Sequence, residues 1–199
     1  MGRLLDAILA AAERRAPAGV GPGELRPLEP RWAPLVVSWV RDDDELFTLA
    51  PKTPAPLDCQ KVLAWARPGG SQLLYRPADA AEPRAYIELN PVPYGERLWW
   101  IGHFLVAPEH RGRGLGRRIL SQVLDEAFLR RRARVVSLVV FPWNIGAIRC
   151  YRRAGLSERG EVFREFAARP GRHRLIYMSI DRHEHGSHRQ TAQLLPPNV

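Results

Sequence analysis

A segment rich in glycine and arginine in the middle of the chain, V-A-P-E-H-R-G-R-G-L-G-R-R over residues 106–118, restricts the possible folds more than any other stretch. Strand-forming residues lead into it and an amphipathic helical pattern starts near Leu115, with glycine at alternate positions between them, Gly112, Gly114 and Gly116. Glycine turns the backbone without steric cost, so successive N–H groups can point into one concavity, to which the following helix adds its free N-terminal donors. The segment therefore predicts a seat for a phosphate or pyrophosphate.

This loop differs from two common phosphate-binding patterns. It lacks the Gly-Lys-Ser or Gly-Lys-Thr sequence that ends a nucleotide-binding P-loop. It also fits the dinucleotide pattern G-x-G-x-x-G poorly, because no glycine completes the pattern after Gly116 and the preceding strand lies in the middle of the chain. Neither of these two nucleotide-binding classes is therefore favoured.

Two motifs together resemble a known superfamily. The pattern R-x-x-G-x-G of residues 111–116, after L-V-x-P at residues 105–108, resembles the acetyl-CoA loop of the GNAT superfamily of N-acetyltransferases. Downstream, N-x-x-A-x-x-x-Y-x-x-x-G-L over residues 144–156 is similar to the second signature of that superfamily, with Leu156 in place of the usual Phe. The resemblance covers about residues 24–181.

The resemblance implies the fold. We expect an α/β (α+β) GNAT fold, with a mixed, mostly antiparallel central sheet of six to seven strands flanked by helices, and a splay between the fourth and fifth strands. Residues 1–23 are expected to form an N-terminal helical extension and linker, residues 24–181 the acetyltransferase domain, and residues 182–199 a disordered tail.

Hydrophobic periodicity and capping residues predict the elements of that domain. Asp58 and Asn144 are expected to cap helices, and Gly155 to end one in the left-handed conformation. The predicted helices cover residues 31–40, 59–67, 115–131 and 145–154, and the predicted strands cover residues 25–28, 71–76, 84–90, 97–106, 135–140, 161–167 and 173–180.

The resemblance also implies acetyl-CoA as co-substrate, without a metal. The backbone of Leu105 and Val106 would bind the pantetheine arm as an added strand would, with an N–H near residues 104–106 meeting the thioester oxygen. Asn144 would bind the cofactor or loop backbone, or serve only as a helix cap. The pyrophosphate would lie on the backbone of Arg111, Gly112, Arg113, Gly114, Leu115, Gly116 and Arg117.

Tyr151 is the first candidate for a catalytic residue. In the superfamily the tyrosine at this position lies near the sulfur and can protonate the departing thiolate; packing of the helix is the alternative role. The general base stays open between Glu88 and His103, because a β-bulge would change which face each residue points to. Glu161 and Glu165 are further candidates, and Cys150 is expected to be a packed thiol.

Bulk composition restricts compartment and partners. Only Cys59 and Cys150 are present, which argues against a disulfide framework and favours the cytoplasm. No apolar run is long enough for a membrane span, so no membrane partner is expected. The net charge of +9 and the arginines of residues 130–134 raise the possibility of nucleic-acid binding, but no nucleic-acid motif accompanies them, and a solvated helix end is preferred.

Two other clusters of polar residues have less specific roles. For one the sequence leaves two roles open, and for the other it favours a role without a ligand. The acidic run Arg-Asp-Asp-Asp-Glu of residues 41–45 would either attract a cationic amine at the acceptor pocket or form a solvated loop that caps a helix turn. His183, His185 and His188 could bind a metal ion, but no acidic or cysteine partners accompany them in the sequence, and a disordered polar tail is expected.

The sequence therefore predicts an acetyl-CoA-dependent N-acetyltransferase. It would transfer the acetyl group directly to a primary amine of a small molecule or a protein N-terminus, as a monomer or homodimer, with no nucleic-acid partner. The alternative from another class is a non-catalytic acyl-CoA-binding module.

Overall fold

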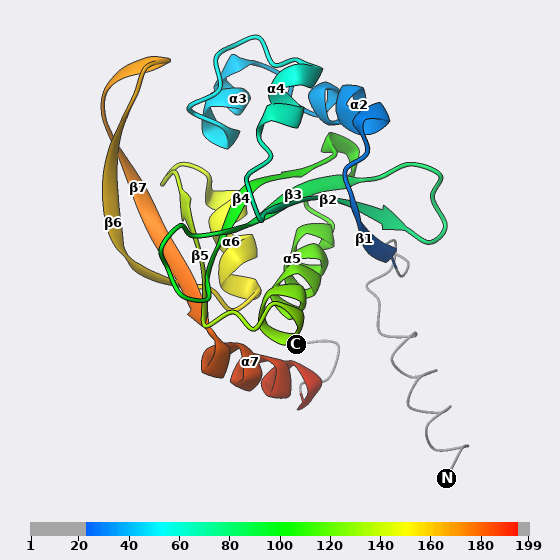
Figure 1. The fold of residues 1–199 in the computed structure, drawn as a ribbon, viewed down its shortest axis with the longest axis vertical. Helices are drawn as coiled ribbons and strands as arrows, with labels where there is room; N and C mark the ends of the chain where they lie inside the picture. Colours follow the sequence, from blue (N-terminus) through cyan, green and yellow to red (C-terminus); the bar gives the residue numbers. More distant parts are fainter. Residues whose placement is uncertain (1–22, 195–199) are drawn as a thin grey trace.

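One sheet of seven strands forms the centre of the protein (Figure 1). The computed structural model describes residues 23–194. The strands lie in the order β1-β2-β3-β4-β5-β7-β6, and all neighbours are antiparallel except β4 and β5, so the predicted mixed sheet is confirmed. The strands are β1 (Gly23–Pro27), β2 (Ser71–Pro77), β3 (Ala85–Pro91), β4 (Leu98–Val106), β5 (Val135–Val140), β6 (Ser157–Phe166) and β7 (Arg169–Asp181).

Helices cover both faces of this sheet (Figure 1). One face packs against α2, α3 and α4, around buried Tyr86 and Leu105, and the other against α5 and α6, around buried Ile87 and Val136. Within residues 23–194, no helix is both long and apolar enough to cross a membrane. The helices are η1 (Pro30–Trp32), α2 (Ala33–Ser38), α3 (Asp43–Leu49), α4 (Cys59–Ala64), η2 (Pro108–His110), α5 (Leu115–Asp125), the π-helical turn η3 (Glu126–Arg130), α6 (Ile145–Arg153) and α7 (Arg182–Leu194).

Local sequence signals set the ends of several helices as predicted. The Asp58 carboxylate accepts a hydrogen bond from the Lys61 N–H at 2.8 Å and caps α4. The Asn144 side chain accepts from the Ala147 N–H at 3.2 Å and caps α6. Gly155 follows α6 with φ of 99°, the left-handed conformation that glycine adopts without strain. These three predictions are confirmed because each depends on contacts within a few residues.

The two parallel strands separate soon after they begin to pair. Leu98, Trp99 and Trp100 of β4 pair with Val135, Val136 and Ser137 of β5. Beyond these pairs β4 stays hydrogen-bonded to β3 as far as Val106, whereas β5 follows β7 as far as Val140. The predicted splay between the fourth and fifth strands is therefore confirmed, and it leaves one edge of β4 free of a neighbouring strand.

A long ribbon of β6 and β7 forms one end of the sheet and extends beyond it (Figure 1). Phe166 and Leu175 of this β6–β7 hairpin pack against Phe47 of α3 and Phe141 after β5. The Phe47 and Phe141 rings are stacked with centroids 5.3 Å apart. This small aromatic cluster joins the hairpin to the helical layer across the open side of the splay.

The C-terminal segment differs from its prediction. The predicted N-terminal helix lies outside the described residues, but the predicted disordered tail is wrong for residues 182–194, which form α7. The Arg182 guanidinium donates to the Phe128 carbonyl at 2.6 Å and to the Ala133 carbonyl at 3.0 Å. His185 is buried against the Phe128 ring, and its Nε2 lies 2.9 Å from Asp125 Oδ1. These contacts are with residues far away in the sequence, so composition alone did not reveal them.

Loss of the Arg182 contacts is expected to weaken the attachment of α7. The Arg182→Ala variant should lose about 1–2 kcal/mol of unfolding free energy, because hydrogen bonds to two backbone carbonyls disappear. Thermal denaturation should show a fall in Tm of about 2–8 °C. Arg130→Ala is the matched control: its side chain is 82% exposed, and its change should stay within about 0.5 kcal/mol. Equal losses in both variants would contradict the assignment.

Candidate active site

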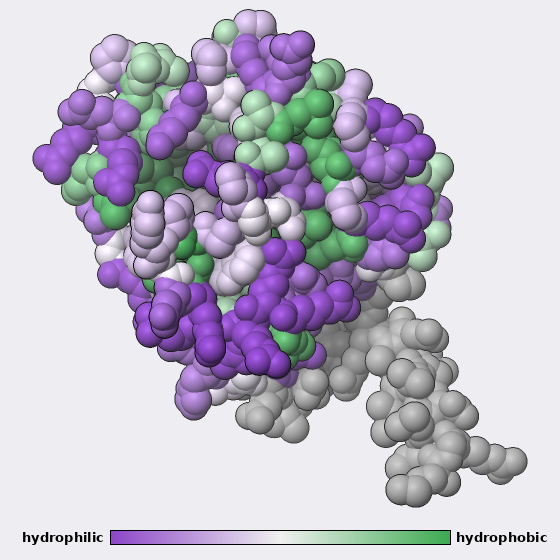
Figure 2. Space-filling model, viewed as in Figure 1, coloured by the Kyte–Doolittle hydropathy of each residue, from purple (hydrophilic) through white to green (hydrophobic). Residues whose placement is uncertain are grey.

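The splay opens into a cleft of about 2670 Å³ that is lined from both layers of the molecule. The free edge of β4, the loop before α5 and the start of α6 line one part of it. Residues of α3, the end of α4 and the β6–β7 hairpin line the other part. Figure 2 shows apolar side chains in a hollow between the hairpin and the α3 region, with hydrophilic side chains around it.

Strand pairing places Glu88 and His103 on the same face of the sheet, beside a β-bulge. Ile87 pairs with Phe104 and Leu89 with Ile101, so Glu88 of β3 lies opposite two residues of β4. Ile87 pairs with Phe104, so the next residue of β4, His103, lies beside Glu88 on the α4 side, and the bulge accommodates the extra residue Gly102. The orientation that the sequence left open is thus set by strand pairing.

Glu88 is a buried carboxylate with three side-chain partners. Only 1% of it is exposed. Its Oε1 accepts from the Tyr86 hydroxyl at 2.7 Å, and its Oε2 accepts from Asn90 Nδ2 at 3.0 Å. His103 Nδ1 lies 2.7 Å from Oε1. A carboxylate accepts hydrogen bonds, so Nδ1 of a neutral His103 carries the proton and Nε2 keeps a free lone pair.

Two further residues fix the position of this pair. The Trp65 ring lies against His103 with centroids 4.2 Å apart, and its Nε1 donates to Thr53 Oγ1 at 2.8 Å. Gly102 gives the carboxylate its space, because a Cβ at this position would lie 2.3 Å from Glu88 Oε2. The dyad of Glu88 and His103 is therefore held by packing as well as by hydrogen bonds.

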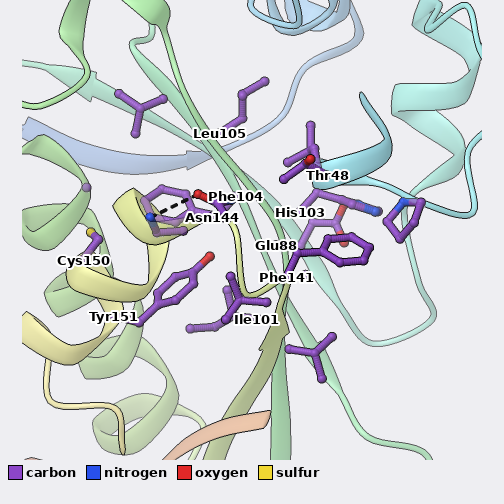
Figure 3. A pocket seen from close by; sticks show the side chains of 18 of the residues that line it. Thr48, Glu88, Ile101, His103, Phe104, Leu105, Phe141, Asn144, Cys150 and Tyr151 are labelled. Carbon is purple, nitrogen blue, oxygen red and sulfur yellow. Dashed lines mark hydrogen bonds and ion pairs between the residues drawn. The ribbon is translucent and has the colours of Figure 1, made fainter. Parts of the chain in front are cut away.

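The Tyr151 side chain comes from the opposite layer. It lies on α6, is 8% exposed and packs near the Phe104 ring, with centroids 6.5 Å apart. Figure 3 shows its hydroxyl directed toward the cleft, with Glu88 and His103 across from it. Burial raises the pKa of Tyr151, so the phenol keeps its proton throughout the neutral range.

The glycine loop before α5 presents backbone donors to the cleft. Gly112 and Gly114 have φ of 73° and 80°, and a Cβ at either position would meet no atom within 4 Å. The first intrahelical bond runs from Arg118 N–H to the Gly114 carbonyl at 3.3 Å. In an α-helix the N–H groups before that bond lack intrahelical acceptors, so those of residues 115–117 are available to an anion.

Arg111 has a role in the structure that its motif position did not reveal. Its Nε donates to the Val106 carbonyl at 2.8 Å, and its two terminal nitrogens reach Glu45 Oε1 at 2.6 Å and the Trp39 carbonyl at 2.9 Å. The Arg111 N–H donates to Pro108. This arginine therefore links the end of β4 to α2 and α3. Its side chain contacts these elements and not the N–H groups of the glycine loop.

The remaining predicted residues divide into those at the cleft and those away from it. Leu105 and Val106 lie at the free edge of β4, and Asn144 lines the cleft while it caps α6. Glu161 and Glu165 do not line the cleft, since the neighbouring positions of β6 face it instead. The lining also contains the predicted loop residues Gly112, Gly114, Gly116 and Arg117, but not Arg113 or Leu115.

Sequence reasoning missed several residues that support the dyad. Tyr86, Glu88 and Asn90 alternate on β3 and share one face, a signal present in the sequence. Gln72 Nε2 donates to the Tyr86 hydroxyl at 2.7 Å, a contact between β2 and β3 that only the register reveals. Trp65 could be found only from the packing of α4.

The acidic run before α3 is both a cap and part of the cleft wall. Asp42 accepts from the Glu45 N–H at 2.7 Å and caps α3, as one of the two predicted roles required. Asp42, Asp44 and Glu45 also line the cleft. Burial opposes ionisation of Glu45, but hydrogen bonds from Arg41 and Arg111 outweigh it and hold the pKa of Glu45 below its usual value.

Residues 34–156 match the acetyltransferase (GNAT) family. The chain is 30% identical over 92 residues to the spermidine N(1)-acetyltransferase of Escherichia coli K12, a match covering 46% of this chain and 50% of that protein. It is 30% identical over 63 residues to the spermine/spermidine N(1)-acetyltransferase of Bacillus subtilis strain 168, covering 32% of this chain and 41% of that protein. The chain thus spans half or less of the length of these relatives.

Two solved structures have a similar fold over most of the chain. A spermidine N-acetyltransferase from Vibrio cholerae in complex with CoA and spermine has a TM-score of 0.68 at 18% identity, covering 82% of this chain and 97% of that one. An aminoglycoside acetyltransferase in complex with coenzyme A and kanamycin has a TM-score of 0.63 at 20% identity, covering 84% and 99%. At these identities the likeness establishes the fold.

The close contact of α5 with α6 predicts a coupled pair of substitutions. A Cβ at Gly116 would lie 2.9 Å from Cys150 Sγ, so Gly116→Ala should lose about 1–3 kcal/mol of unfolding free energy in denaturant titrations. Adding Cys150→Ala removes the sulfur and should recover most of the lost unfolding free energy. Gly146→Ala is the control, because no atom lies within 4 Å of its added Cβ. Additive losses in the double variant would contradict this steric account.

Proposed function

Because the chain belongs to the acetyltransferase (GNAT) family, we propose that it is an N-acetyltransferase that moves the acetyl group of acetyl-CoA directly to a primary amine. The observation that carries this proposal is the separation of β4 from β5, at whose open end the glycine loop presents backbone donors. The names of the relatives, which are N-acetyltransferases of spermidine and spermine, support amine acetylation as the reaction class.

The residues present fit a coenzyme A ester. The N–H groups of the loop and of the first turn of α5 suit a pyrophosphate, which takes its charge stabilisation from the helix dipole. The free edge of β4 at Leu105 and Val106 suits the amides of the pantetheine arm, which would extend the sheet as another strand does. The cleft between β4 and β5 then has room for the thioester within the sheet.

His103 is the proton acceptor in this proposal, and Glu88 is its positioning residue. The attacking nitrogen forms a C–N bond to the thioester carbonyl, and the C–S bond breaks. The amine must lose a proton, and the free Nε2 of His103 can accept it. Glu88 orients the imidazole through Nδ1 and stabilises the positive charge that the ring acquires.

Tyr151 is the proton donor to the departing thiolate. The residue faces the cleft from the side opposite the dyad, so one wall can receive a proton while the other supplies one (Figure 3). Its buried phenol remains protonated at neutral pH, as a general acid requires. Cys150, beside it in sequence, has a pKa raised by burial to about 11, which leaves it a poor nucleophile and favours direct transfer over an acyl-cysteine step.

Location and partners complete the proposal. The thiols of Cys59 and Cys150 are unpaired, in keeping with a cytoplasmic protein. Nucleic acid is not a proposed partner, since Arg131 in the basic patch lies 4.8 Å from the Trp99 ring centroid and donates to Ser71 Oγ at 2.8 Å. We expect a monomer or a homodimer.

Acetyl transfer is tested by incubating the full chain with acetyl-CoA and a panel of primary amines, with released thiol and acetylated amine as readouts. Tyr151→Phe and His103→Ala should each lower kcat by about 10²–10⁴-fold, the range for loss of a general acid or base. Tyr94→Phe is the matched control, because Tyr94 is fully exposed and does not line the cleft. Wild-type turnover in the Tyr151 variant would contradict its role as proton donor, whereas CoA binding without acetylation of any amine would support a non-catalytic acyl-CoA-binding module.

The pH dependence gives a second check on Tyr151. Because burial raises the pKa of its phenol above the usual value of 10.0, the proton donor should stay intact up to about pH 10. The kcat profile should therefore show no decline from loss of this proton between neutrality and that pH. A decline near pH 8 that disappears in Tyr151→Phe would contradict the role of the buried phenol.

A further inference from the structure

The carboxylates of α3 at the acceptor end of the cleft already have partners. The acceptor end is the part lined by α3 with the residues just before and after it, the end of α4, the Glu88–His103 dyad and the β6–β7 hairpin. Asp42 caps α3, and Asp44 forms an ion pair with Arg169 of the hairpin. Glu45 lies 2.6 Å from Arg111. Each of these three carboxylates thus has a hydrogen-bonding or ionic partner within the protein.

Glu88 is the fourth carboxylate of the acceptor end, and it is engaged as well. It is buried and bonded to Tyr86, Asn90 and His103 at 2.7, 3.0 and 2.7 Å. A second ammonium group on a substrate would have to displace these partners to reach it. Across the described lining of the acceptor end, every carboxylate therefore has a hydrogen-bonding or ionic partner.

Two cations at the same end lack such partners. Among the described residues, neither Lys52 nor Arg67 has a carboxylate oxygen within 4.0 Å. Both adjoin Trp65, since Arg67 follows it by two residues and Thr53, next to Lys52, accepts the Trp65 indole N–H at 2.8 Å. Trp65 lies against His103, and the two unpaired cations line the same cleft as this side chain, which would accept the proton of the amine.

The total charge of the acceptor end is also positive. Its lining has four carboxylates and five guanidinium or ammonium groups. A polycation would meet net repulsion there, whereas an anion would be attracted and held. The groups are Asp42, Asp44, Glu45 and Glu88 against Arg41, Lys52, Arg67, Arg164 and Arg169.

We infer that the preferred acceptor is a small amine that also carries an anionic group, a carboxylate or a phosphate, which Lys52 and Arg67 bind while the amine faces His103. The inference rests on the proposed acetyl transfer and narrows its substrate class. It separates this chain from the relatives that are named for spermidine and spermine, whose substrates carry only positive charge.

Matched acceptors of equal chain length test the inference. The set is 5-aminopentanoate, 5-aminopentyl phosphate, 5-amino-1-pentanol and 1,5-diaminopentane, which differ only in the group distal to the reacting amine. With acetyl-CoA and the full chain, kcat/KM for at least one anionic acceptor should exceed that for the diamine by about tenfold or more, with the alcohol between them. The preference should shrink as ionic strength rises, since both cations are exposed. Comparison of 5-aminopentanoate with 5-aminopentyl phosphate shows which anionic group is preferred.

Charge reversal identifies the cations responsible. Arg67→Glu and Lys52→Glu should each lower kcat/KM for the anionic acceptors by about tenfold or more and raise it for the diamine. Arg134→Glu is the matched control: it makes the same charge change at an exposed arginine that does not line the cleft, and should leave the ranking unchanged. An unchanged ranking in both cleft variants would overturn the assignment of Lys52 and Arg67.

A binding measurement separates this inference from the proposed reaction. If no amine is acetylated, calorimetry of the CoA-saturated protein with 5-aminopentanoate, 5-aminopentyl phosphate and 1,5-diaminopentane still ranks the acceptors. Tighter binding of an anionic compound that Arg67→Glu weakens supports the inference, even though the proposed activity would have failed. Tighter binding of the diamine, higher kcat/KM for the diamine, or binding of none of the three overturns it.

Discussion

The early separation of β4 from β5 is the constraint on which the rest of this structure depends. The two strands share a parallel register at Leu98–Trp100 and then turn to different partners, β3 on one side and β7 on the other. Each strand thus keeps one hydrogen-bonded neighbour, and the open edges face one another across the cleft. If β4 and β5 were paired along their full length, there would be no room for a ligand between them.

The pairing of β3 with β4 positions the candidate dyad on this scaffold. It sets His103 beside the Glu88 carboxylate, and the α4 layer holds the imidazole through Trp65. Tyr151 reaches the cleft from α6, on the other layer. The candidate site therefore combines groups from both faces of the sheet, which only the splay allows to meet.

Much of the fold could be predicted from the sequence, because its signals are local. The caps at Asp58 and Asn144 and the left-handed Gly155 each depend on a few neighbouring residues. The bulge, the contacts of Arg111 and the docking of α7 depend on pairing and packing between distant segments, and none of them has a signature in a short window. The sequence therefore named candidate residues for the site, while the partnership of Glu88 with His103 required the register of two strands.

Gly102 has a consequence for how such a site can change over evolutionary time. The position that a Cβ would occupy lies 2.3 Å from a Glu88 oxygen, so even alanine would evict the carboxylate. Substitution of Gly102 by any residue with a side chain is therefore excluded as long as the Glu88 carboxylate stays in place. A lineage that adopts different acid–base chemistry must therefore replace residue 88 before the glycine of β4 can be lost.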